Sequence, residues 1–309
     1  MKIVLCDSLD LLKRSPAMSK KLLLSRIVFC FVLLGIPGTG ATMETERLII
    51  RDITGKMSSE RFEKLASKAD STLTEILRFW SAEPRVNELG KIIVEFDHPL
   101  PKASTSIFFW SKEKGQRVRV VRVFGGDEHP HLLAHKLTSA VFPNPDKLIR
   151  NMMGEASEKR FGNPLAFPMC GFDKDEWIMA LLQVGSYIPL TKIGQDHSDW
   201  GMEINNNVPE VKDRAKQHAS YLEAGSFGEF LITTYGTEKM KQFNRLSRNR
   251  PRPWKEVFGI TLEQLEAKWL EAIKLASRDK EGKISTLVKL VKKDPNTACF
   301  SAQNLAEGK

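Results

Sequence analysis

The sequence DEHPHLLAHKLTSA, residues 127–140, decides how the rest of the chain is interpreted. Proline is tolerated in a helix only in the first turn, so a helix is expected to begin beside Pro130. His131 and His135 then stack one turn apart on one face of that helix. The opposite face is an apolar stripe at the 3.6-residue period, made of Leu133, Leu137, Ala140 and Val141.

Two imidazoles one turn apart can bind a single divalent ion, because their nitrogens converge on a point about 2 Å from each. Glu155 is the natural third ligand, since it lies on the inner side of a second expected helix, residues 145–161. An inward carboxylate is unfavourable unless a metal, another cation or a hydrogen-bond donor meets it. The pattern favours a zinc site of His131, His135 and Glu155, and packed or surface histidines that bind nothing are the alternative.

The motif HLLAH at residues 131–135, followed after nineteen residues by Glu155, resembles the gluzincin metallopeptidases, the group that contains thermolysin and the aminopeptidase N relatives. The runs YLEAGSFGEFLITTYG (221–236) and WKEVFGITLEQLEAKWLEAI (254–273) resemble the C-terminal half of bacterial peptidase MA-like domains. The resemblance covers roughly residues 77–276. It implies an α+β fold of the thermolysin-like, gluzincin zincin type, with a small N-terminal mixed sheet before a mostly helical C-terminal lobe.

One residue departs from the family pattern. Active members carry a glutamate base directly after the first histidine, and this chain has Leu132, which cannot transfer a proton. The resemblance also implies that Tyr221 stabilises the oxyanion of the reaction, although a tyrosine packed in the core is an equal reading. We therefore expect a catalytically impaired domain that binds peptide or protein. The alternatives are an active zinc hydrolase with Asp127 or Glu128 as its base, and a structural cell-envelope protein without metal.

The N-terminus has the layout of a signal peptide. Basic residues precede the apolar run 27–36, and small residues follow it up to Ala41. We expect residues 1–41 to be removed, which predicts a periplasmic or secreted protein whose partner is a peptide or protein of the cell envelope. A retained signal would anchor the chain, but the run is short for a bilayer span, so no stable span is expected after cleavage. Met18 is an alternative start.

Two of the four cysteines, Cys6 and Cys30, belong to this leader. The remaining pair, Cys170 and Cys299, can form a disulfide in an exported chain or remain as two thiols. The absence of a Cys-x-x-Cys pair excludes a thiolate zinc ribbon.

The net charge does not point to a nucleic-acid partner. The chain carries +9, of which the leader contributes six Lys or Arg and two Asp, a net of +4, so about +5 remains. A basic run is interpreted as a solvated loop between helices rather than a phosphate-binding surface. Its members are Arg245, Arg248, Arg250, Arg252, Trp254 and Lys255.

The other elements follow from apolar periodicity, caps and turns. Strands are expected at residues 47–53, 92–96, 106–110 and 118–124, with a turn at 114–115. Helices are expected at 58–81, capped by Ser58 or Ser59, at 173–185, capped by Asp173 or Asp175, through Tyr221 on a face shared with His218, and at 261–276, with Thr261 and Gln264 as a capping box. The expected divisions are an N-terminal α/β lobe (42–126), a helical lobe (127–276) and a loosely attached polar, basic tail (277–309) with a short helix near 284–291.

Four single residues carry further expectations. His197, between two acids, is interpreted as an exposed loop histidine rather than a ligand. Glu223 and Glu229 are interpreted as solvated helix charges. Gly225 lies inside a helix, where glycine is unfavourable by about 1 kcal/mol relative to alanine, so another backbone is expected to pack closely there.

Overall fold

The computed structural model describes residues 40–98, 106–125, 130–205 and 208–309, all of which belong to one compact unit. The expected signal peptide, apart from its last two residues, lies outside the described residues. Asp127 and Glu128, the alternative bases, also lie outside them.

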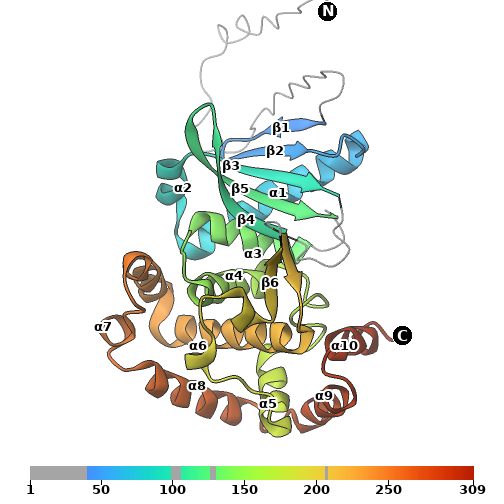
Figure 1. The fold of residues 1–309 in the computed structure, drawn as a ribbon, viewed down its shortest axis with the longest axis vertical. Helices are drawn as coiled ribbons and strands as arrows, with labels where there is room; N and C mark the ends of the chain where they lie inside the picture. The colour runs from blue at the N-terminus through green and yellow to red at the C-terminus, as the bar shows by residue number, and fades with distance from the viewer. Residues whose placement is uncertain (1–39, 99–105, 126–129, 206–207) are drawn as a thin grey trace, which may run out of the picture. The chain divides into compact units, whose positions relative to one another are not determined.

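A five-stranded mixed sheet forms the N-terminal part of this unit (Figure 1). The strands are β1 (Thr42–Glu44), β2 (Leu48–Asp52), β3 (Ile92–Asp97), β4 (Ser106–Glu113) and β5 (Gln116–Phe124). Their order is β1-β2-β3-β5-β4, in which β2, β3 and β5 run parallel and the two edge strands are antiparallel. The expected turn at Lys114 and Gly115 joins β4 to β5, with both residues at positive φ. The predicted strands are therefore confirmed, and β1 is the one strand of this sheet that was missed.

The two faces of the sheet differ in chemistry. One face is apolar and joins the main core through Leu48, Ile50, Ile92, Val94, Phe96, Val121 and Val123. The other face carries a cross-strand ladder in which Glu95 pairs with Arg122 at 2.8 Å and with Arg51 at 3.8 Å. Arg51 also binds Glu113 with both guanidinium nitrogens. Because every second residue of a strand points to the same face, this alternation fixes which side of the sheet is covered.

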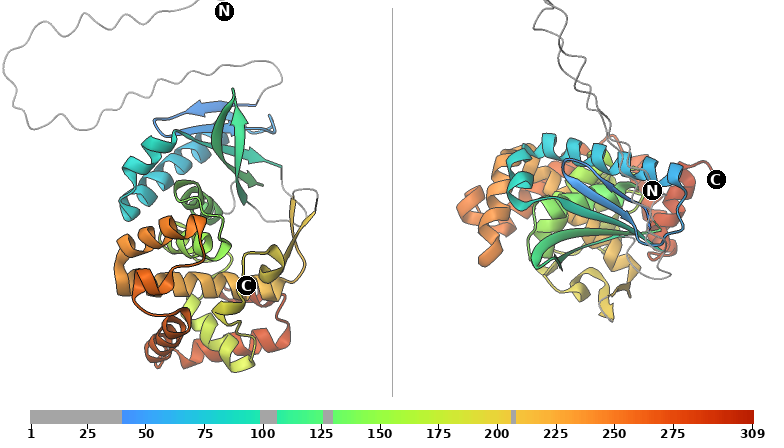
Figure 2. Two further views of the ribbon diagram at one scale, coloured as in Figure 1. Left: turned by 60° about the vertical axis from the view of Figure 1, so that its left-hand side comes forward. Right: turned by 90° about the horizontal axis from the view of Figure 1, so that it is seen from above.

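Helix α1 (Ser59–Trp80) packs in the same core as the apolar face and begins at the expected cap, where Ser58 accepts a hydrogen bond from Arg61 N. Helix α2 (Glu83–Leu89) completes the connection to β3 and was not predicted. Figure 2 shows α1 lying along one side of the sheet.

The chain after β5 is mostly helical. Its helices are α3 (Pro130–Val141), α4 (Lys147–Phe161), α5 (Lys174–Val184), α6 (Arg214–Leu246), α7 (Trp254–Phe258), α8 (Leu262–Ala276), α9 (Glu281–Lys293) and α10 (Ala298–Ala306). Short elements between them are η1 (Leu190–Lys192), η2 (His197–Trp200), η3 (Ser247–Asn249) and the hairpin of β6 (Met202–Asn205) and β7 (Val208–Val211). The architecture is thus the expected mixed α/β one, with a small sheet before a helical part, and the β6–β7 hairpin was missed.

Helix α3 connects the sheet to the helical part. It contacts α1, β4 and β5 on one side and α4 on the other, and α4 in turn packs on α6. Pro130 is its first residue, as expected, and the apolar stripe of Leu133, Leu137, Ala140 and Val141 is buried. Close packing of α4 on α6 depends on Gly228, because a Cβ there would lie 2.8 Å from Met152 O.

The C-terminal segment is not a loosely attached tail, so that expectation is wrong. Helix α9 packs on α5 and buries Ile284, Leu287 and Val291, which lie on one face at helical spacing. Helix α10 carries Cys299, which forms a disulfide with Cys170 across a sequence separation of 129 residues. The polar composition of the segment concealed this narrow apolar stripe.

None of the helices among the described residues combines the length and the apolar character that a membrane crossing requires.

Loss of the disulfide is expected to destabilise the fold. Replacing Cys170 and Cys299 by alanine releases a cross-link that closes a long loop, which typically contributes about 2–4 kcal/mol. Urea unfolding should show this loss in the free energy of unfolding, and wild type in reductant should match the variant. Equal stability of variant and oxidised wild type would contradict the cross-link.

Candidate functional site

His135 is the centre of a buried polar cluster between α3 and α4. Its imidazole is 1% exposed and faces one stripe of α4. Nδ1 lies 3.1 Å from Glu158 Oε2 and 3.2 Å from Glu155 Oε1, while Nε2 lies 2.9 Å from Asn151 Oδ1. Positions 151, 155 and 158 fall on one face of a helix because they are spaced by four and three residues. A single imidazole thus meets three polar side chains of the neighbouring helix.

Gly154 allows this approach. It lies on the same stripe of α4, and a Cβ at this position would be 2.5 Å from His135 Cδ2. Every side chain other than hydrogen would therefore push the imidazole away from Glu155 and Glu158.

Lys174 supplies the cation that the inward Glu155 requires. Its Nζ lies 2.8 Å from Glu155 Oε2 and donates to the backbone oxygen of Glu155 at 3.1 Å. The lysine is the first residue of α5, and its stem passes over Gly225, where a Cβ would be 2.7 Å from Lys174 Cδ. The expectation of a second backbone at Gly225 is therefore wrong, because a lysine side chain takes that space.

The charges in the cluster are mutually dependent. Burial favours the neutral form of Glu155, but Lys174 and His135 outweigh it and hold the pKa of that carboxyl below its usual value. Burial and the neighbouring Glu155 charge raise the pKa of Glu158. Burial and Lys136 disfavour imidazolium, yet the hydrogen bonds to both carboxylates raise the pKa of His135. Lys174, Glu155, His135 and Glu158 therefore form one ion-paired network.

The sequence-predicted residues are only partly brought together. His135 and Glu155 meet, and the Tyr221 ring lies beside them, with its centroid 6.0 Å from that of His135. His131 and Leu132 belong to the first turn of α3, and their side chains are outside what the structure describes.

Sequence reasoning missed Asn151, Glu158 and Lys174. The first two share a helical stripe with Glu155, and this spacing was visible in the sequence. Lys174 was not detectable, because it comes from a different helix.

The residues at this centre include a ligand set for a metal. The ligand-type atoms of His135, Glu155 and Glu158 all lie within 4.8 Å of one another. Glu158 Oε1 and Asn151 Nδ2 are buried and have no hydrogen-bond partner among the residues that the structure describes. Two carboxylates and an imidazole are ligands of zinc-type ions. A metal at this point has to displace the proton on His135 Nδ1, so metal and proton compete for the same atom.

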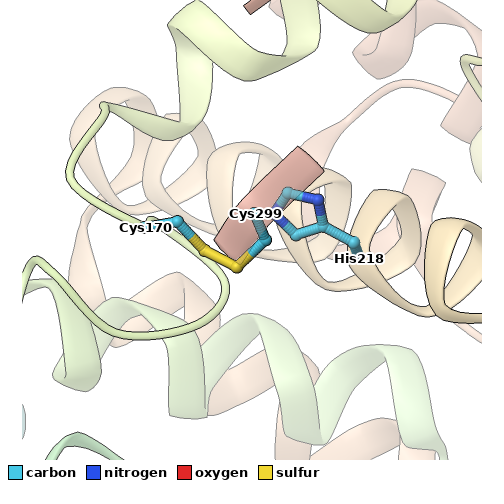
Figure 3. A group of neighbouring side chains, drawn as sticks. All are labelled: Cys170, His218 and Cys299. Atoms are coloured by element: carbon cyan, nitrogen blue, oxygen red, sulfur yellow. A yellow bond between two sulfur atoms is a disulfide. The ribbon is translucent and has the colours of Figure 1, made fainter. Parts of the chain in front are cut away.

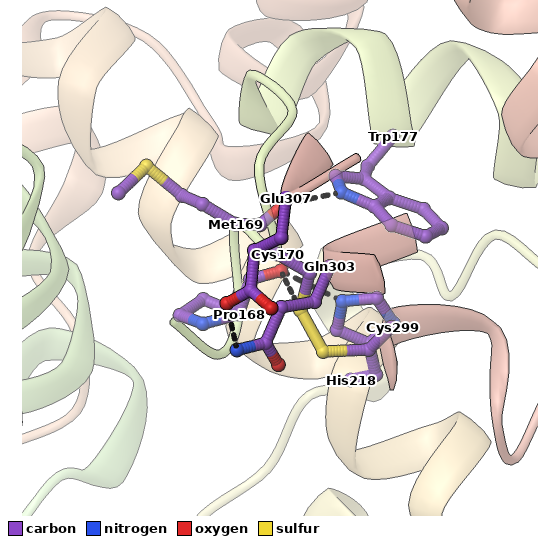
Figure 4. Close-up of a disulfide and its surroundings, with 8 residues drawn as sticks. All are labelled: Pro168, Met169, Cys170, Trp177, His218, Cys299, Gln303 and Glu307. Atoms are coloured by element: carbon purple, nitrogen blue, oxygen red, sulfur yellow. Dashed lines mark hydrogen bonds between the residues drawn. A yellow bond between two sulfur atoms is a disulfide. The ribbon is translucent and has the colours of Figure 1, made fainter. Parts of the chain in front are cut away.

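A second cluster, of Cys170, His218 and Cys299, is not available to a metal in this state. The two sulfur atoms are bonded to each other beside the His218 ring (Figure 3). His218 Nε2 hydrogen-bonds the Pro168 oxygen at 2.7 Å, in the loop that carries Cys170 (Figure 4). Burial lowers the pKa of His218 to about 4, so the ring is a neutral core histidine.

Two glutamates of α6 differ from the expectation of solvated charges. Glu223 is completely buried and accepts a hydrogen bond from Ile188 N at 2.9 Å, and burial raises its pKa. Glu229 forms a bidentate ion pair with Arg160, in which both N–O distances are 2.7 Å. Both were misjudged because the residues that pack against α6 come from distant parts of the sequence.

The basic run near residue 250 is largely engaged within the protein. Arg252 binds Asp146 with two nitrogens, at 2.6 and 3.1 Å. Arg250 pairs with Glu256 at 2.8 Å, and Trp254 is buried in the core. The interpretation as a solvated loop is therefore wrong for Arg252 and Trp254, which are fixed by tertiary contacts.

Substitution of Gly154 tests the His135 contact. Gly154→Ala should lower the free energy of unfolding, because the new methyl group overlaps the imidazole. Gly282→Ala in α9 is the matched control, since nothing lies within 4 Å of its Cβ position and alanine favours a helix by about 0.5–1 kcal/mol. The melting temperature and the free energy of unfolding in urea should fall for Gly154→Ala and rise for Gly282→Ala. A neutral Gly154→Ala would contradict the contact.

The His218 environment predicts a pH dependence of stability. Its folded pKa of about 4 lies below the ordinary 6.5, so the unfolded chain binds the proton more readily and stability falls as pH drops from 6.5 toward 4. The full shift corresponds to about 3 kcal/mol. Urea unfolding of wild type and His218→Gln at pH 7.5 and 5 should show a smaller loss in the variant. An equal loss would contradict a neutral buried ring.

No protein-family model, curated protein or solved structure matches this chain. Its function is therefore inferred from the side chains described above.

Proposed function

We propose that this chain is an exported peptidase MA-like domain, of gluzincin zincin type, that binds an extended peptide or protein segment without hydrolysing it efficiently. The observation that carries the proposal is the ion pair between Glu155 and Lys174, at 2.8 Å. In a zinc peptidase the carboxylate at this position is a metal ligand, and here a fixed ammonium neutralises it. Leu132, at the position of the general base, points to the same loss of hydrolysis.

The order of elements supports the zincin part of the proposal. A mixed sheet ends in the β4–β5 hairpin, and α3 with the HLLAH motif follows it. Helix α4 then presents Glu155 to His135. This succession of edge strand, histidine helix and glutamate helix is what the family resemblance requires.

The antiparallel edge of the sheet supports the peptide-binding part. Strand β4 pairs with β5 on one side and is the last strand of the sheet on the other. An edge strand offers unpaired backbone groups to an extended segment, which can add to the sheet as a further strand. The guanidinium of Arg117 stacks on Trp110 at 4.1 Å, which gives this edge a rigid aromatic surface.

A zinc-binding form of the same centre is the second candidate, because His135, Glu155 and Glu158 have a suitable set of ligand atoms. Bound zinc would supply Lewis-acid activation of a carbonyl or of water. His135 and the two carboxylates would hold it, and Tyr221 would lie within the same polar region. Hydrolysis would still need a base in place of Leu132, for which Asp127 and Glu128 are the sequence candidates.

Measuring zinc binding by wild type and by a variant without Lys174 distinguishes the ion-paired form of the centre from the zinc-binding form. We expect little zinc in purified wild type, and we expect Lys174→Met to leave Glu155 as an uncompensated buried charge, destabilising the protein by about 3–5 kcal/mol. Added zinc should restore the melting temperature of this variant more than that of wild type. Elemental analysis and thermal unfolding measure both effects, with Lys289→Met, which changes an exposed lysine of α9, as control.

One zinc per wild-type chain, lost in both His135→Ala and Glu155→Ala, would contradict the ion-paired form and establish the metal form. Robust hydrolysis of a synthetic peptide pool by wild type would contradict the loss of catalysis. Peptides from the same pool that are retained intact would support binding without cleavage.

A further inference from the structure

Three basic side chains gather beside the His135 centre without forming ion pairs. Lys136 follows His135 on α3, and Lys147 and Arg150 lie one turn apart at the start of α4. Among the described residues, no carboxylate lies within ion-pair distance of any of the three. Within the described part of the chain, the one hydrogen bond of the Arg150 guanidinium goes to the Asn144 backbone oxygen, at 2.9 Å.

Lys147 is the most unusual of them because it is 4% exposed. Its Nζ lies 5.0 Å from the centroid of the Trp200 ring and 3.8 Å from Met202 Sδ. Neither group neutralises an ammonium. Burying an ammonium without an opposite charge is strongly unfavourable, and the cation–π contact with Trp200 offsets only part of that cost, so this position reduces the stability of the fold.

The neighbouring cations make this arrangement still less favourable. Burial, followed by the charges of Lys136 and Arg150, lowers the pKa of Lys147 to about 7, and Asp199 is the opposing negative charge. Positive groups held together at a cost in stability are typical of binding sites.

The nearby acids are already engaged. Asp146 caps α4 by accepting from Leu148 N and Ile149 N, and it binds Arg252 with both oxygens. Glu155 and Glu158 are paired with Lys174 and His135, as described above. Asp199 is the remaining acid, and it attracts Lys147 without forming an ion pair among the described residues. One carboxylate against three basic groups leaves a local excess of positive charge.

Two further groups border the cluster. Burial raises the pKa of Tyr221, and Arg150 acts against this rise, so the phenol is a neutral hydroxyl near Arg150. The Tyr221 ring is held by Trp200, at a centroid distance of 5.2 Å. His197 of η2 is partly exposed, and burial together with Lys147 and Arg150 lowers its pKa. A hydroxyl donor and a titratable imidazole therefore face the same positive region.

We propose that Lys136, Lys147 and Arg150 form a binding site for an oxyanion, the carboxylate or phosphate group of a ligand. An oxyanion would neutralise the three charges and accept hydrogen bonds from the amines, the guanidinium and the Tyr221 hydroxyl. This site is separate from the sheet edge and from the His135 ligand set, so it does not depend on the proposed peptide binding.

The test is titration of the full chain by isothermal calorimetry with two probes, sodium sulfate and sodium acetate, at constant ionic strength set with sodium chloride. Replacing both Lys147 by Met and Arg150 by Gln should raise the dissociation constant at least tenfold. The matched control, Lys289→Met with Lys292→Met, removes two exposed lysines of α9 and should leave the dissociation constant unchanged. Circular dichroism checks that each variant is folded.

The two probes distinguish the sources of the oxyanion. Preference for acetate assigns the site to a carboxylate, such as a peptide C-terminus, and preference for sulfate assigns it to a phosphate-type group. Absence of measurable binding to wild type overturns the proposal. Equal weakening in the control variant also overturns it, because it would show only a general charge effect.

A stability measurement gives an independent readout. Without oxyanion, Lys147→Met should raise the melting temperature, because it replaces a buried amine by an apolar chain of similar length. The same variant should lose the stabilisation that sulfate or acetate gives to wild type. A lysine with a purely structural role predicts the reverse, a lower melting temperature with stabilisation by the anion retained, and that result would overturn the proposal.

Discussion

The contact of one buried imidazole with one stripe of α4 determines how the sheet and the helical part are joined. His135 cannot approach Glu155 and Glu158 unless position 154 is glycine, and Glu155 cannot stay buried and charged unless Lys174 reaches it. Lys174 in turn needs Gly225, because its stem passes where a side chain of α6 would lie. Helices α3, α4 and α5 are thereby fixed around one set of charges, and α6 packs against them at Gly225. This arrangement explains why glycine occurs inside a helix at positions 154 and 225.

The charged groups around this contact fall into two sets, one in which acids and bases are paired and one in which basic groups lack an ion-pair partner. Acidic groups are paired with Lys174 and His135, so the centre is electrically balanced without any bound ion. One to two turns before Glu155, at the start of α4, Lys147 and Arg150 have no carboxylate within ion-pair distance among the described residues, and Asp199 supplies only a longer-range attraction to Lys147. A fold selected for stability alone would be expected to bring these opposite charges together, because every unpaired buried charge lowers the free energy of unfolding. Their separation is therefore better explained by binding than by folding.

The sequence predicted the elements whose signals are local. Pro130, the Ser58 cap and the capping box of Thr261 and Gln264 located helix ends correctly, because these residues act on the backbone within one turn. The meeting of His135 with Glu155 was also predicted, from helical faces. The sequence did not predict the position of Lys174, the burial of Glu223 or the packing of the C-terminal helices. Each of these depends on a contact between segments far apart in the chain. The Cys170–Cys299 pair remained open for the same reason.

In the proposed function, a leucine at position 132 in place of the base and the presence of Lys174 beside Glu155 have a common physical consequence. A zinc ion needs its ligands free of protons and of competing cations, and it is useful for hydrolysis only when a base activates water beside it. Once the base is absent, a metal at His135 and Glu155 adds stability but no chemistry. A lysine that neutralises Glu155 gives comparable stability without a metal supply and leaves the helices in the same arrangement. Under the proposed function, the ion pair between Glu155 and Lys174 preserves the shape of the centre, so that binding at the sheet edge and at the basic cluster requires neither a metal nor catalysis.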